Sequence, residues 1–156
     1  MVTGFIEYQQ KTTMLLNVSY NRPKIKQQID NSVGKSFSIV ERIKLGGIGS
    51  GKLVINSASQ QIHNLLILDS YTNVCSMEIR PQGVILNFRS ILETYALVIP
   101  YHKLHIYKGE SEQYSIFMDS YFVKVKADQK RIHQFMRKVL DHKLSVTGQG
   151  NDEYYS

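Results

Sequence analysis

A glycine-rich stretch is the part of this sequence whose composition and spacing best match a known chemistry. Residues 46–52 read GGIGSGK and fit the pattern G-x-x-x-x-G-K, in which backbone N–H groups and a lysine surround a phosphate. Gly49, Gly51 and Lys52 are the candidate anion-binding residues of this loop. The pattern also requires a Ser or Thr for magnesium directly after the lysine, and Leu53 stands there instead. A turn between strands is therefore the preferred interpretation, and a nucleotide-binding protein is the alternative.

The elements that follow a phosphate-binding loop are not favoured by the sequence. Such a loop is followed by a helix, yet residues 53–63 include Val54, Asn56 and Ser57, which are poor helix formers. The run 65–69, LLILD, resembles the strand that carries an acidic magnesium ligand in such enzymes. The rest of the sequence nevertheless predicts hairpins rather than the crossover connections of that fold.

The other reactive residues form no recognisable catalytic pattern. The five histidines show neither H-x-x-x-H nor H-E-x-x-H spacing, so no metal site is predicted. Cys75 is the only cysteine, which excludes an internal disulfide and indicates a small buried hydrophobic residue. No nucleophile motif and no pair of catalytic carboxylates is recognisable. The sequence therefore predicts a protein that is not an enzyme and that needs no cofactor.

Positive charge is in excess. Nineteen Lys and Arg residues against thirteen Asp and Glu give a formal charge of +6 and a pI near 9.4. The candidate interaction surface lies on the outer face of a predicted C-terminal helix and comprises Lys130, Arg131, Arg137 and Lys138. Because no run exceeds two cations, we expect weak, nonspecific attraction to polyanions. A solvated helix face is the simpler interpretation, and peripheral binding to an anionic membrane or to nucleic acid is a further alternative.

The C-terminal half predicts a hairpin followed by an amphipathic helix. Asp119 and Ser120 predict a two-residue loop that pairs Met118 with Tyr121, Ile116 with Val123 and Tyr114 with Val125. The helix is predicted over 129–143, with Asp128 as its N-cap. Its apolar stripe consists of Ile132, Phe135, Met136, Val139 and Leu140.

The remaining pattern predicts short strands and one further helix. The helix covers 23–32, where Ile25, Ile29 and Val33 repeat every four residues and Pro23 suits the first turn. Strands are predicted at 12–20, 37–45, 63–69, 75–80, 84–89, 94–99, 103–108, 113–118 and 121–126. Residues 145–156 are expected to be a disordered tail.

The order of these elements resembles a known fold. The segments IHNLLILDS, MEIRPQGVILNFRS, ETYALVIPYHKLHIYKG and YFVKVKA resemble uncharacterised bacterial proteins grouped with the pleckstrin-homology-like (PH-like) barrel. The resemblance covers residues 63–144 and leaves 1–60 outside. It implies a barrel of about seven antiparallel strands, closed at one end by the C-terminal helix, in a protein that binds or scaffolds. The basic residues Lys52, Arg80, Arg89 and Lys108 are scattered, so the dense basic loops of lipid-binding members have no counterpart.

These observations predict a mainly β, α+β domain over residues 1–144. Within it, 1–60 form an N-terminal strand-helix-strand extension, and 63–144 form the barrel and helix. The predicted function is a non-enzymatic binding or protein-interaction module, whose partner is another protein or a second copy of the chain. No apolar run is long enough to span a membrane and no signal-peptide pattern is present, so a cytoplasmic location is expected.

Overall fold

The computed structural model describes residues 14–68, 73–109 and 112–148, which form an α+β fold. Its strands are β1 Leu15–Asn17, β2 Leu53–Ala58, β3 Val74–Arg80, β4 Gly83–Ser90, β5 Glu93–Pro100, β6 His105–Lys108, β7 Gln113–Met118 and β8 Tyr121–Lys126. Its helices are α2 Pro23–Val33, α3 Ile39–Lys44, α4 Gln60–Leu66 and α5 Lys130–Thr147, with a 3-10 turn, η1, at Tyr101–Lys103.

The strands form an open antiparallel sheet rather than a closed barrel. Its order is β1-β5-β4-β3-β2-β8-β7-β6, so β1 and β6 lie at its two ends. The predicted barrel is therefore wrong. Closure would require the end strands to pair with each other. Instead, the 3-10 turn separates β5 from β6, and β1 pairs with β5 at that edge.

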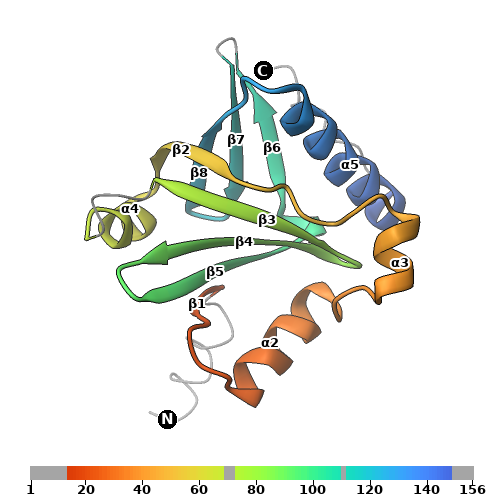
Figure 1. Ribbon diagram of the computed structural model, residues 1–156, viewed down its shortest axis with the longest axis horizontal. Helices are drawn as coiled ribbons and strands as arrows, with labels where there is room; N and C mark the ends of the chain where they lie inside the picture. The colour runs from red at the N-terminus through yellow and green to blue at the C-terminus, as the bar shows by residue number, and fades with distance from the viewer. Residues whose placement is uncertain (1–13, 69–72, 110–111, 149–156) are drawn as a thin grey trace.

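The core lies between the two halves of this curved sheet. Strands β6 to β8 run across strands β3 to β5, and α5 packs at one end of the space between them (Figure 1). The stripe of α5 enters this core, where Ile132, Phe135, Met136 and Val139 are buried. Leu140 is half-buried at its margin.

The hairpin and the last helix follow the sequence prediction closely. Strands β7 and β8 pair in the predicted register, with Met118 opposite Tyr121 and Ile116 opposite Val123. Helix α5 begins after Gln129 rather than Asp128, whose carboxylate lies 3.4 Å from Lys126 Nζ instead of capping the helix. The helix also continues to Thr147, so the first residues of the predicted tail are helical. Residues 149–156 lie outside the described residues.

Two predicted strands are helices. Residues 37–45 contain α3, because Ser38 and Glu41 form a capping box that starts a helix. Residues 63–69 overlap α4, in which the i, i+4 pair Ile62 and Leu66 is buried. A short apolar run does not distinguish the helical repeat of about 3.6 residues from the strand repeat of two, which explains why both segments were predicted as strands. The strand β2 lies earlier, in residues 53–58, where no strand was predicted.

Candidate functional site

The two sets of site residues predicted from the sequence meet in the structure. The glycine-rich loop 46–52 lies against α5, where Arg131 donates from Nη1 to the Ser50 carbonyl (2.7 Å) and from Nη2 to the Lys52 carbonyl (2.8 Å). Lys138 Nζ donates to the carbonyls of Gly46 (3.3 Å) and Gly47 (3.2 Å). Two of the four candidate cations on α5 thus hold the loop in place.

The loop geometry differs from a phosphate-binding loop. The N–H of Gly47 donates to Arg42 (2.8 Å), and the N–H of Ser50 donates to Met77 (2.9 Å). These two N–H groups are therefore occupied by protein carbonyls. The loop leads into strand β2 instead of a helix. Gly49, Gly51 and Lys52 are exposed, as are Lys130 and Arg137 on α5.

A different basic site lies beside α2. It is a groove of about 690 Å³, which we call the α2 groove. Its walls are residues 18–22 before α2, one face of α2, residues 35–36 after it, and Arg80 at the end of β3. Its charged residues are the cations Arg22, Lys26, Lys35 and Arg80 and the single carboxylate Asp30. This site was not predicted from the sequence, because Arg22, Lys26 and Lys35 match no known motif and Arg80 lies forty-five positions beyond Lys35.

Packing against the sheet fixes the position of α2. Pro23 occupies the first turn, and Val33 at the other end is fully buried. Val33 packs so closely on β4 that a Cβ at Gly83 would lie 2.6 Å from Val33 Cγ1 and 2.3 Å from the Ile99 carbonyl. Gly34 then ends the helix with a φ of 84°. The cations on α2 are thereby held at a fixed distance from the sheet.

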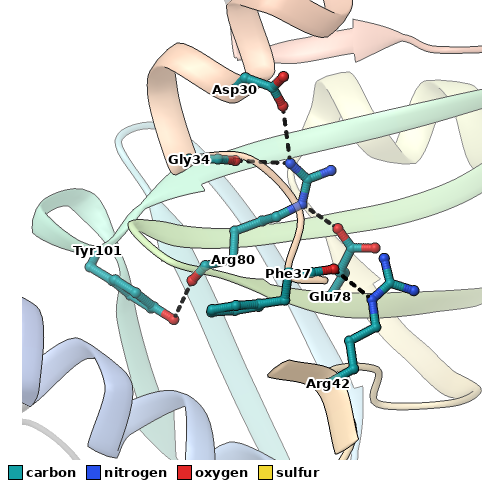
Figure 2. A network of polar contacts seen from close by, with 7 residues as sticks. All are labelled: Asp30, Gly34, Phe37, Arg42, Glu78, Arg80 and Tyr101. Atoms are coloured by element: carbon teal, nitrogen blue, oxygen red, sulfur yellow. Dashed lines mark hydrogen bonds and ion pairs between the residues drawn. The ribbon is translucent and has the colours of Figure 1, made fainter. Parts of the chain in front are cut away.

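Arg80 connects the floor of the groove to α2 (Figure 2). Its Nη1 donates to Asp30 Oδ1 (3.2 Å) and to the Gly34 carbonyl (2.9 Å), and its Nε donates to Glu78. The hydroxyl of Tyr101 donates to the Arg80 carbonyl (3.1 Å). Burial raises the pKa of Tyr101, so this hydroxyl stays protonated. Within the described ranges Nη2 of Arg80 has no hydrogen-bond partner, and only 14% of the side chain is exposed.

The electrostatics of the groove favour an anion. No side chain caps the start of α2 and its first turn carries no acid, although Arg22, Lys24 and Lys26 stand there. Cations at this positive end of the helix dipole destabilise the helix unless an anion offsets them. Arg22 also lies over the Tyr20 ring, 5.4 Å from its centroid, which holds both side chains at the rim.

The groove is lined by hydroxyl side chains and contains no cysteine. Its hydroxyl groups include Ser19, whose Oγ accepts a hydrogen bond from the Thr94 N–H (2.7 Å). Cys75 lies elsewhere, and burial raises the pKa of its thiol to about 12, so it is an inert core residue. In the part of the chain that the structure describes, no three His, Cys, Asp or Glu residues gather as metal ligands.

Comparison with known proteins assigns no family. No family model matches this chain, and searches of curated proteins and of solved structures give no significant match. Among the described helices, none is both long enough and apolar enough to cross a membrane.

Proposed function

We propose that this chain is a non-enzymatic binding module that holds an anionic ligand in the α2 groove. The observation that carries the proposal is the groove itself, whose lining holds four cations and one carboxylate, Asp30, while Glu78 beside the lining also pairs with Arg80. Asp30 is already engaged with Arg80. Arg22, Lys26 and Lys35 are exposed and form no ion pair among the described residues, so they are the groups that would receive the ligand.

The lining indicates the chemical class of the ligand. Several cations spread around one groove suit a molecule with more than one carboxylate or phosphate group. Val18, Ile25 and Ile29 lie between them and offer apolar contact to a carbon skeleton. A volume of about 690 Å³ is within the range of small-molecule sites, roughly 300 to 1,000 Å³.

The other functional hypotheses have weaker support. Nucleotide binding at loop 46–52 lacks a following helix and a hydroxyl after Lys52. Polyanion binding by α5 would depend on Lys130 and Arg137, because Arg131 and Lys138 already donate to loop carbonyls. A relation to PH-like proteins stays a proposal, supported by the order of short antiparallel strands before one C-terminal helix but without the barrel. A cytoplasmic location likewise stays a proposal.

Calorimetry with two simple polyanions tests the anion site. Pyrophosphate represents phosphate ligands and citrate represents carboxylate ligands, so the stronger one identifies the preferred chemistry. We expect saturable binding to the full chain at low salt. The double variant Lys26→Gln/Lys35→Gln should weaken it about tenfold, because two screened charge interactions contribute roughly 0.7 kcal/mol each.

The matched control removes the same charge from α5. Lys130→Gln/Arg137→Gln should change the affinity by less than about twofold, because these residues lie outside the groove. Absence of saturable binding by both anions would contradict the proposal. Equal losses in the two double variants would show only a diffuse effect of net charge, and a larger loss in the α5 variant would move the site to that helix.

A further inference from the structure

Helix α3 exposes an aliphatic surface that the fold does not use. Ile39, Val40 and Ile43 are 75%, 61% and 75% exposed, and no residue of this helix is buried. A surface helix normally turns such residues toward the core. Ile39 and Ile43 are one turn apart and Val40 adjoins them, so the three side chains form one continuous face, which we call the α3 face.

The helix is maintained by its cap rather than by burial. Ser38 Oγ accepts a hydrogen bond from the Glu41 N–H (3.2 Å), and Glu41 Oε1 accepts one from the Ser38 N–H (3.1 Å). These hydrogen bonds lower the pKa of Glu41, so the carboxylate is ionised at neutral pH. Isoleucine and valine are poor helix formers, so this segment is helical without gaining core contacts in return.

Contacts on both sides of α3 hold it in place beside the end of α5 (Figure 1). Before the helix, the Phe37 ring lies 6.4 Å from the His142 ring of α5, and Arg42 Nε donates to the Phe37 carbonyl (3.0 Å). After the helix, Lys138 Nζ binds the Gly46 and Gly47 carbonyls. The α3 face is therefore presented in a fixed orientation, which lowers the entropic cost of binding a partner.

The charges around the α3 face are basic. Arg42 and Lys44 are exposed on the helix itself, and Lys138 lies at its far end. The one acid on α3, Glu41, is engaged in the capping box. A second copy of this chain would bring the same cations to the contact, on a protein whose formal charge is +6, and like charges would oppose its docking.

We infer that the α3 face is a docking surface for an amphipathic helix of another protein, with an aliphatic stripe flanked by Asp or Glu. The stripe packs on Ile39, Val40 and Ile43, and the acidic flanks lie beside Arg42 and Lys44. Helix-to-helix recognition of this kind uses anchors spaced by three and four residues, which matches the spacing of the α3 face. This inference is independent of the α2 groove.

Synthetic peptides provide the probe. One amphipathic helical peptide carries a leucine stripe with glutamate flanks, and a second carries the same stripe with lysine flanks. Fluorescence anisotropy with the full chain should show saturable binding of the glutamate peptide and at least tenfold weaker binding of the lysine peptide. Lys44→Glu should weaken binding of the glutamate peptide about threefold and strengthen binding of the lysine peptide, as expected for a charge at the rim of a contact.

Two surface variants locate the contact. Ile39→Gln/Ile43→Gln should weaken the glutamate peptide at least tenfold while circular dichroism stays unchanged, because neither residue supports the core. Ile67→Gln/Leu92→Gln removes comparably exposed aliphatic residues elsewhere (59% and 84%) and should leave binding unchanged. Equal losses in both variants, or unchanged binding in the first, would overturn the inference. If sedimentation shows that the unsubstituted chain is a dimer and that Ile39→Gln/Ile43→Gln is a monomer, the α3 face binds a second copy of the chain. That result would also overturn the inference.

Discussion

Helices α2 and α5 are both basic and amphipathic, yet their cations have different surroundings. On α5, Arg131 and Lys138 donate to backbone carbonyls of the glycine-rich loop. Next to α2, Lys26 and Lys35 line a groove and pair with nothing among the described residues. The apolar faces differ as well, because α5 buries four stripe residues whereas Val33 alone is buried on α2.

This difference shows that, for ligand binding, the position of a cation in the fold matters more than the density of cations along the sequence. Two of the four cations in the denser basic pattern on α5 are structural, because Arg131 and Lys138 join the loop to the helix. The cations around α2 come from residues 22–35, which form and flank one helix, and from Arg80 on β3, which folding brings beside that helix. A ligand can use only those cations whose hydrogen-bonding groups are not already satisfied by the protein.

The largest expected effect concerns the core contribution of the two helices. Phe135→Ala on α5 should lower the free energy of unfolding by about 3 to 5 kcal/mol, because it leaves a cavity under the helix. Ile29→Ala on α2 should cost only about 1 kcal/mol, since this side chain is half-buried. Urea denaturation gives both values. Equal midpoint shifts would show that α2 contributes as much to the core as α5.

A smaller effect is expected at the contact between α5 and the loop. Arg131→Gln should lower the free energy of unfolding by about 1 kcal/mol, because it removes the donors to the Ser50 and Lys52 carbonyls. Lys130→Gln, one residue earlier and exposed, should change it by less than about 0.5 kcal/mol. Faster hydrogen exchange in loop 46–52 of the Arg131 variant alone would confirm the local cause. Identical exchange in both variants would mean that Arg131 does not hold the loop.

The sequence was sufficient to predict an element correctly where two local signals agreed. The β7–β8 hairpin was predicted residue by residue, because the alternation of both strands had to agree through one two-residue turn. The stripe of α5 was also correct, since five apolar residues at helical spacing leave little ambiguity. The seven-strand barrel failed because sheet closure depends on which distant edges pair, and short-range patterns do not specify this.

Elements with conflicting local signals were predicted less well. In 37–45, the apolar alternation of Phe37, Ile39, Ile43 and Leu45 suggested a strand, whereas the capping box of Ser38 and Glu41 produced a helix. The S-x-x-E pattern was visible in the sequence and could have corrected this prediction. The α2 groove could not have been found in the same way, because Arg80 and the sheet that close it meet α2 only through tertiary packing.

The smallest expected effect distinguishes the influence of the helix dipole on stability from the influence of the α2 groove on anion binding. Both α2 and α5 lack an acid in the first turn, so Lys24→Glu and Lys130→Glu should each raise the free energy of unfolding by about 0.3 to 1 kcal/mol in urea at low salt. The two variants should differ in anion binding. Lys24 is next in sequence to the groove residue Ile25. Lys24→Glu should therefore weaken the binding of pyrophosphate or citrate about threefold through charge repulsion alone, whereas Lys130→Glu should leave that binding unchanged. Both the stabilisation and the loss of affinity should fall when salt is raised to about 0.5 M, where the Debye length is only about 4 Å. Equal losses of affinity in the two variants would mean that net charge, rather than the position of the α2 groove, controls anion binding.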